Sequence, residues 1–338
     1  MKIQIIRHTP TSHRYIIGTA ILALLSMLAF LYKTTDGLGA RLPEAPELSA
    51  SASSCSIGSP PWKNYDHEIM LNHMKTFNEI WTARPGGDND GGGGFFHYFA
   101  LYNIIKSTKP TTIIESGAHR GVGTWFLRQM AGNDTHIIVV SPQQPQIYVD
   151  RVGDGSKSTY FTGSKFEDFN SIKWNEVVDD PKTTLVFIDD HQAGIRRMEE
   201  AKARGFKHIV FDDNYPPGEG DNMSGKWLCD PKLWSVVGRD EEYTYVDNFG
   251  QIRKPITTTE YLQYVDRFNG VASVYAEFPP VWEGPSRFYT KDITDKITQP
   301  PLFSNPGDLS FLDENTMAKK SFDSESKKYT WILYVGLS

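Results

Sequence analysis

Residues 185–192 read LVFIDDHQ and residues 209–217 read IVFDDNYPP, two short apolar runs that each stop on a pair of aspartates. Short apolar runs bounded by turn-forming residues are typical of buried strands. Each predicted strand therefore ends in two carboxylates. The aspartates are Asp189, Asp190, Asp212 and Asp213.

Similar apolar runs recur along the middle of the chain and alternate with helical patterns. Strands are expected over residues 111–115, 136–140, 159–163, 184–188 and 208–211, and helices over residues 122–130 and 193–204. Strands separated by helices form βαβ units with a parallel sheet. Right-handed crossovers place the carboxyl ends of such strands along one edge, where ligands bind. We therefore expect an α/β fold with a Rossmann-like, doubly wound, mostly parallel sheet and the aspartates at its ligand-binding edge.

The C-terminal residues 329–337, YTWILYVGL, predict one more strand. We expect it to be antiparallel and to lie at or near an edge of the sheet, which returns the C-terminus to the core. Residues 62–338 then form one domain. Within it, an insert over about residues 214–325 begins at the ligand-binding edge and is expected to cover the substrate.

The composition excludes some classes of protein. Hydrophobic residues make up 39% and charged residues 22% of the 338 residues, as in a globular chain. The net charge of −6 and the scattered Lys and Arg offer no basic surface, so no nucleic-acid partner is expected. For Cys55 and Cys229, one disulfide and two unpaired thiols are both open. The sequence does not indicate an oligomeric state.

The N-terminal part predicts a membrane anchor. Residues 15–32, YIIGTAILALLSMLAFLY, carry no charge, and as a helix they would span ~27 Å, about the thickness of a thin bilayer core. Positive charges precede this run, which predicts a cytoplasmic tail over residues 1–14 and a lumenal body, in a type II membrane protein of the Golgi or endoplasmic reticulum. Residues 33–61, rich in Ser, Ala, Pro and Gly, predict a flexible stem. A cleaved signal peptide is the alternative.

The first expected strand runs into a glycine-rich turn. Residues 115–123 read ESGAHRGVG, an E-x-G-x-x-x-G-x-G pattern with an acid two residues before the first glycine. Such turns let the backbone approach a cofactor closely. The pattern resembles motif I of class I S-adenosylmethionine-dependent methyltransferases. The resemblance implies that the methionine and ribose parts of the cofactor lie among four residues, and that a side chain at the first glycine would fill the cofactor's space. These residues are Glu115, Gly117, Gly121 and Gly123.

The same resemblance assigns two further positions. In the family an acid usually ends the second strand and holds the ribose hydroxyls, whereas here the run HIIVV is followed by Ser141. Ser141 is therefore assigned to the ribose. After the third strand, residues 165–169 fall where the family often contacts adenine, which points to Asp168. Because the usual acid is missing, a non-catalytic member of the fold is one alternative.

The paired aspartates predict a cation site. Carboxylates at close range repel each other unless a cation is present, and oxygen ligands suit Mg²⁺. An acid after the fourth strand and an acid pair after the fifth resemble the metal-dependent macrocin-type O-methyltransferases and the cephalosporin-hydroxylase-like proteins. The resemblance implies Mg²⁺, or another divalent cation, on Asp189, Asp212 and Asp213, with Asp190 as the alternative to Asp189. The residues alone also allow the aspartates to cap the following helices.

These patterns together predict an S-adenosylmethionine-dependent O-methyltransferase that acts on a hydroxyl of a sugar, a glycan or a related small molecule. The cation would lower the pKa of that hydroxyl, and His191 or Asp190 would take its proton. An imidazole suits this role because it titrates near neutral pH. The second alternative is a metal-dependent glycosyltransferase, because Asp88 and Asp90 form a D-x-D pattern.

Overall fold

The structure is a computed structural model that describes residues 55, 58–86, 93–150, 157–215, 223–229, 242–247, 250–281, 300–314 and 332–338. The chain divides into two compact units, Met1–Glu47 and Leu48–Ser338, and every described residue belongs to the second. The predicted tail, membrane segment, most of the stem and the D-x-D pattern lie outside the described residues. Within these ranges, no helix is both long and apolar enough to cross a membrane.

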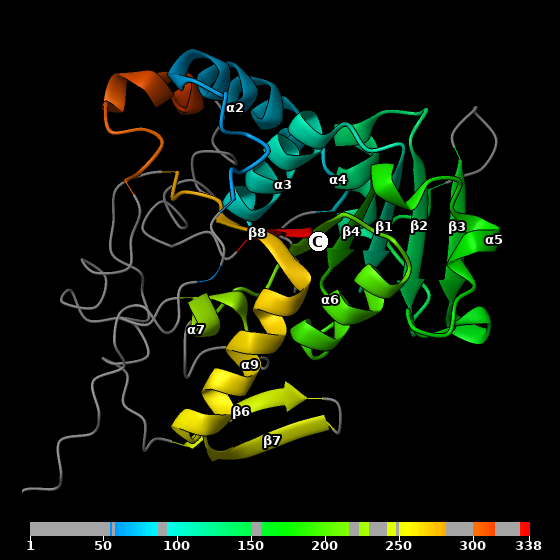
Figure 1. Ribbon diagram of the computed structural model, residues 1–338. Helices are drawn as coiled ribbons and strands as arrows, with labels where there is room; N and C mark the ends of the chain where they lie inside the picture. The colour runs from blue at the N-terminus through cyan, green and yellow to red at the C-terminus, as the bar shows by residue number, and fades with distance from the viewer. Residues whose placement is uncertain are drawn as a thin grey trace, which may run out of the picture. The chain divides into compact units, whose positions relative to one another are not determined.

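The core of the fold is a seven-stranded sheet with the order β3-β2-β1-β4-β5-β9-β8 (Figure 1). The first five strands of this order are parallel, and β9 is antiparallel to both of its neighbours. The strands are β1 (Thr112–Ser116), β2 (His136–Ser141), β3 (Ser158–Thr162), β4 (Thr184–Ile188), β5 (His208–Phe211), β8 (Ala272–Glu277) and β9 (Leu333–Leu337). The predicted α/β class and mostly parallel sheet with an antiparallel C-terminal strand are confirmed. That strand, β9, lies one position inside the edge, because β8, which the sequence analysis did not predict, pairs with its outer side.

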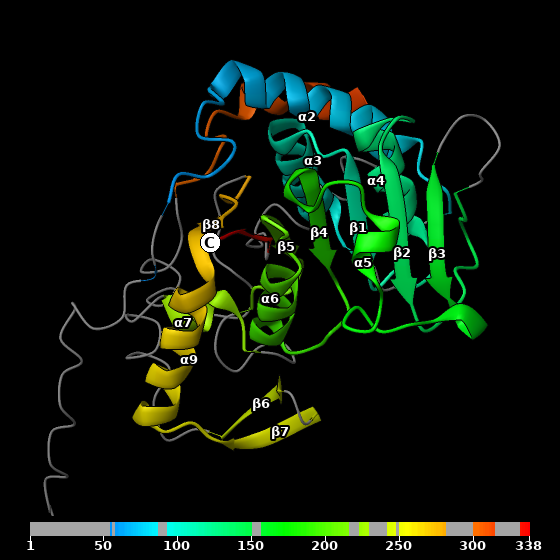
Figure 2. The same ribbon diagram turned by 45° about the vertical axis from the view of Figure 1, so that its right-hand side comes forward.

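Helices cover both faces of the sheet (Figures 1 and 2). Successive strand residues point to opposite faces, so Ile113 of β1 joins the core under α2, α3 and α4, and Ile114 joins the core under α5, α6, α7 and α9. The helices are α2 (His67–Thr82), α3 (Phe95–Thr108), α4 (Val122–Ala131), α5 (Trp174–Val177), α6 (Gly194–Ala203), α7 (Gly225–Cys229) and α9 (Thr258–Val271). The remaining elements are a small sheet of β6 (Glu242–Asp247) and β7 (Gly250–Pro255), and the 3₁₀ turns η1 (Gly163–Lys165), η2 (Pro181–Thr183) and η3 (Pro306–Glu314).

Local sequence signals set where several helices begin. The carboxylate of Asp66 accepts a hydrogen bond from the Ile69 amide at 2.9 Å and caps α2. Thr257 and Glu260 form a reciprocal capping box at the start of α9. These caps satisfy amides that would otherwise have no partner in the first turn.

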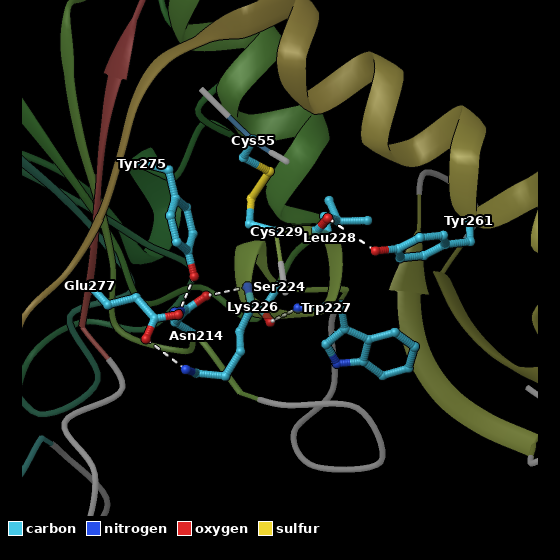
Figure 3. Close-up of a disulfide and its surroundings, with 10 residues drawn as sticks. All are labelled: Cys55, Asn214, Ser224, Lys226, Trp227, Leu228, Cys229, Tyr261, Tyr275 and Glu277. Atoms are coloured by element: carbon cyan, nitrogen blue, oxygen red, sulfur yellow. Dashed lines mark hydrogen bonds and ion pairs between the residues drawn. A yellow bond between two sulfur atoms is a disulfide. The ribbon is translucent and has the colours of Figure 1, made fainter. Parts of the chain in front are cut away.

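A disulfide joins Cys55 to Cys229, the last residue of α7, with a Cα–Cα distance of 5.0 Å (Figure 3). Of the two alternatives that the sequence left open, the paired one is therefore observed. The bridge ties a residue of the predicted stem to the helix that follows β5. Disulfides are typical of proteins of oxidising compartments. The location in the secretory pathway stays a prediction.

Candidate functional site

The carboxyl ends of β1, β4 and β5 lie side by side. Ser116 of β1 is in register with Ile188 of β4, which is in register with Phe211 of β5. The residues after these strands leave the sheet together: the Asp189 amide donates to the Ser116 carbonyl at 2.7 Å, and the Asp212 amide donates to the Ile188 carbonyl at 3.0 Å. The aspartate pairs and the glycine turn therefore share one edge of the sheet.

One group at this edge has the spacing of cation ligands. Asp189, His191 and Asp213 each offer one ligand atom, and these atoms all lie within 4.8 Å of one another. Nδ1 of His191 is 3.0 Å from Oδ2 of Asp213, and the His191 side chain is 60% exposed. His191 has a φ of 53°, so the chain turns sharply there and carries the imidazole back toward β5.

Asp212 is not a member of this group, which departs from the predicted ligand set of Asp189, Asp212 and Asp213. Its Oδ1 lies 3.7 Å from Nδ1 of His97 in the first turn of α3. His191, predicted from the sequence as a base, is the third member of this group, and the metal ligands stay a prediction.

Burial and mutual repulsion disfavour the ionised forms of the acids at this edge. Burial, and then the charge of Asp213, raise the pKa of Asp212 to about 8. Burial, and then the charges of Asp212 and Asp213, raise the pKa of Asp189 well above its usual range. A divalent cation would relieve both effects, because it replaces lost water and neutralises repelling charges.

Asp190, the second predicted base, is held by three donors. Its carboxylate accepts from Ser116 Oγ at 2.7 Å, from Arg197 Nε at 2.9 Å and from the Gln192 amide at 3.1 Å. These three donors occupy both oxygens of the carboxylate. The geometry therefore gives Asp190 a structural role and does not support it as the proton acceptor.

The glycines of the turn are required by close contacts between backbone segments. Gly117 has a φ of +99°, and a Cβ atom there would lie 1.9 Å from the Asp189 carbonyl oxygen. Gly121 has a φ of +90°, and a Cβ atom there would lie 2.1 Å from the Tyr148 carbonyl oxygen. The expectation that a side chain at Gly117 would fill cofactor space is wrong, because the backbone of the β4 turn already occupies that position.

Glu115 lies beneath the turn and is buried. Its Oε2 accepts from Thr124 Oγ1 at 2.5 Å, and a Cβ atom on Gly123 would lie 2.5 Å from its Oε1. Gly123 therefore leaves room for this carboxyl group at the start of α4. Burial raises the pKa of Glu115 to about 8, and the bond from Thr124 only partly opposes the shift. These contacts give Glu115 a supporting role under the turn.

Glu115→Gln is expected to flatten the pH dependence of stability. Because the pKa is about 8 in the folded protein and 4.5 without burial, the folded state binds more protons than the unfolded state between these values. Stability then falls as pH rises through this window, by up to about 1.4 kcal/mol per pH unit for one group. Denaturant unfolding across the window should show a shallower decline for the variant. Parallel curves would contradict the shift.

The two positions assigned to the far end of the cofactor differ in their surroundings. Ser141 is the last residue of β2 and is buried beside the turn, since the Gly117 amide donates to the Val140 carbonyl at 2.9 Å. Asp168 is 42% exposed, and both of its carboxylate oxygens accept from the Arg197 guanidinium, at 3.0 and 2.7 Å. Ser141 therefore lies where the resemblance places it, whereas the Asp168 carboxylate is engaged by a side chain.

Sequence reasoning missed two residues of this edge. His97 follows the glycine-rich stretch before α3, and a single histidine within the apolar run FFHYF was the available signal. Arg197 had no such signal, because it is one of two adjacent arginines on α6, and its partners Asp168 and Asp190 belong to other segments.

Comparison with solved structures gives distant likenesses. A protein from Klebsiella pneumoniae described as an O-methyltransferase is 12% identical, with a TM-score of 0.32, over 66% of this chain and 84% of its own. A cyclopropane-fatty-acyl-phospholipid synthase-like protein from Lactobacillus casei is 11% identical, with a TM-score of 0.35, over 78% and 99%. The O-methyltransferase from Bacillus cereus in complex with SAH is 13% identical, with a TM-score of 0.29, over 54% and 87%.

Neither a protein-family model nor a curated protein matches the chain. At the identities and TM-scores above, the likeness to solved structures carries no argument about activity. The narrower macrocin-type group is not confirmed. The strand order β3-β2-β1-β4-β5-β9-β8, with β9 antiparallel and a glycine turn after β1, fits a Rossmann-like methyltransferase fold.

Proposed function

We propose that the protein is an S-adenosylmethionine-dependent methyltransferase that transfers a methyl group to a hydroxyl with the help of a divalent cation. The observation that carries the proposal is the group of Asp189, His191 and Asp213 at the same sheet edge as the glycine turn. The acceptor class, a sugar or glycan hydroxyl, rests on the resemblance of the sequence. The glycosyltransferase alternative has no described residue in its favour.

The donor atoms fit a divalent cation, and they suit other metals besides Mg²⁺. Asp189 and Asp213 offer oxygen, which suits Mg²⁺ and Mn²⁺, whereas the nitrogen of His191 also suits Zn²⁺ and Fe²⁺. The set therefore departs from the all-oxygen site predicted for Mg²⁺. Ser141 and the backbone of the glycine turn are the groups that would hold the cofactor.

The chemistry needs a donor, an activated hydroxyl and a proton acceptor. S-adenosylmethionine supplies the methyl group, and a cation lowers the pKa of a hydroxyl that it contacts. When Nδ1–H of His191 donates to Asp213, the Nε2 atom of the imidazole is the one that can take the hydroxyl proton. Asp213 then orients the ring and stabilises its charged form. One imidazole nitrogen cannot both bind the cation and take the proton, so His191 acts as the base only when the oxygens of Asp189 and Asp213 hold the cation.

Asp213→Asn, with Asp212→Asn as its matched control, tests the site. Added Mn²⁺ or Mg²⁺ should stabilise the parent protein by RT ln(1 + [L]/Kd), about 2.7 kcal/mol at a hundredfold excess over Kd. Asp213→Asn should lose most of this gain, because an amide is a poorer ligand than a carboxylate. Asp212→Asn should keep more of it than Asp213→Asn does, because Asp212 is outside the group although its charge acts on Asp189. Thermal melts in chelator and in metal, with SAH present, measure the gain.

Two results would count against the proposal. A parent protein that shows no metal-dependent shift in any of these melts would leave the acids as structural residues. If only Asp212→Asn lost the metal-dependent stabilisation, Asp212 would be a ligand, as the sequence predicted. Calorimetry with SAH and with a nucleotide sugar separates the methyltransferase from the glycosyltransferase.

A further inference from the structure

Arg197 of α6 is a buried cation that three acids share. Its side chain is 2% exposed. The guanidinium donates to both oxygens of Asp168, at 3.0 and 2.7 Å, to Oδ2 of Asp190 at 2.9 Å, and to Oε2 of Glu200 at 2.8 Å. A buried arginine is tolerated only when it is paired in this way. Its planar fork also fixes the direction of each partner.

Two of the three partners of Arg197 belong to loops that follow different strands of the sheet. Asp168 follows β3 and η1, Asp190 lies in the turn after β4, and Glu200 is on α6 itself. The other donor to Oδ2 of Asp190 is Ser116 Oγ at 2.7 Å, and Ser116 directly precedes Gly117. A continuous series of hydrogen bonds therefore runs from the loop after β3, through Arg197 and the β4 turn, to the end of β1.

This series ends at Ser116, next to the glycine turn where the cofactor is proposed to bind. Gly117 begins the glycine turn after β1, and the Asp189 backbone packs against it. The Gln192 amide, which donates to Oδ1 of Asp190 at 3.1 Å, fixes the other side of the β4 turn. The pairing with Arg197 is bidentate, and the hydrogen bond from the guanidinium lowers the pKa of Asp168 to about 2.

We propose that Arg197 is a positioning residue for cofactor binding, and that Asp168 acts through Arg197 rather than by contacting adenine. The proposal rests on the proposed function. By holding Asp168 and Asp190 at a fixed separation, Arg197 sets the loop after β3 and the turn after β4 relative to the glycine turn. If Arg197 only stabilised α6, its bond to Glu200 on the same helix would be enough. The contacts with Asp168 and Asp190 would then not be needed.

A double-mutant cycle tests this. Arg197→Lys keeps the charge but loses the planar guanidinium, and Asp168→Asn removes the charge of one partner without changing the carboxylates of Asp190 and Glu200. Each single variant should bind SAH about tenfold more weakly in calorimetry, and the double variant should bind no more weakly than the worse single one. Arg267→Lys is the matched control, since the Arg267–Glu199 pair also involves α6 but is over a third exposed, and its SAH affinity should not change.

The outcomes separate the proposal from the function on which it rests. If Asp168→Asn weakens SAH binding and Arg197→Lys does not, Asp168 contacts the ligand directly and the proposal is overturned. Additive losses in the double variant overturn it as well. A parent protein that does not bind SAH overturns the proposed function and the proposal together.

A second measurement covers the case in which Arg197→Lys does not fold. In Asp168→Asn, which changes a half-exposed side chain, the rearranged guanidinium should loosen Asp190 and speed hydrogen exchange at the Gln192 amide several-fold. Asp168 and Gln192 are joined only through Arg197 and Asp190 in this series, so a direct ligand contact would leave that amide unchanged. Unchanged exchange at Gln192 overturns the proposal.

Discussion

Replacing Gly117 with alanine should lower the free energy of unfolding by at least about 3 kcal/mol, because it combines backbone strain with a clash. The φ of +99° is a conformation that side chains rarely adopt. The new Cβ atom would lie 1.9 Å from the Asp189 carbonyl oxygen and 2.4 Å from its carbon. Both atoms are backbone, so the β4 turn itself would have to move. Denaturant unfolding measures the loss.

Gly163→Ala is the control that separates strain from the clash. Gly163 also has a positive φ, +57°, but its nearest neighbour would be the Gln144 side chain at an ordinary 3.6 Å. Its replacement should cost only the left-handed conformation, about 1–2 kcal/mol. If both replacements lowered the free energy of unfolding equally, the β4 turn would be able to move away from the new Cβ atom at little cost. Since that turn carries Asp189 and His191, a surviving Gly117→Ala protein should also lose its metal-dependent stabilisation.

Lys226→Met should lower the free energy of unfolding by about 3–5 kcal/mol, because it removes one partner of a buried ion pair. Lys226 Nζ lies 2.6 Å from Glu277 Oε2, and the two side chains are 2% and 7% exposed. Glu277 also accepts from Tyr275 and from Asn214, as Figure 3 shows, but neutral donors do not compensate a buried charge. Urea unfolding of the parent and the variant gives the difference.

The double variant Lys226→Met/Glu277→Gln should recover most of that loss, because replacing both charges of a buried pair by neutral groups is often tolerated. The exposed Arg267–Glu199 pair supplies the comparison, and Arg267→Met should cost no more than about 1 kcal/mol. Two results would contradict a strong buried ion pair. One is a loss of stability in Lys226→Met that is as small as the loss in Arg267→Met. The other is a double variant that is no more stable than Lys226→Met.

The Lys226–Glu277 pair also supports the stretch that carries Asp213. Glu277 ends β8, and its neighbour across the sheet, Leu333, is in register with Phe211 of β5. Asn214, the residue after Asp213, accepts from the Lys226 amide at 2.9 Å and donates to Glu277 at 3.2 Å. Loss of the pair should therefore weaken cation binding as well as the fold.

The sequence by itself determined the parallel part of the sheet and the edge at which the aspartate pairs and the glycine turn lie. Apolar runs and their spacing are local properties, so strands such as β4 and helices such as α4 and α6 could be predicted to within about two residues. The handedness of βαβ crossovers then placed Asp189, Asp212 and the glycine turn at one edge. The pairing of β9 with β8 could not be predicted, because β8 begins more than 60 residues after β5 and its pattern is weak.

Only the tertiary structure decided which side chains at that edge meet. A turn with a positive φ brings His191 to Asp213, while Oδ1 of Asp212 lies 3.7 Å from Nδ1 of His97 on α3. The contact that requires Gly117 to be glycine comes from the β4 turn, and the partners of Cys55 and Arg197 lie on distant segments. Such contacts depend on how packed elements approach one another, and no local pattern of residues encodes the distance between two side chains that the fold brings together.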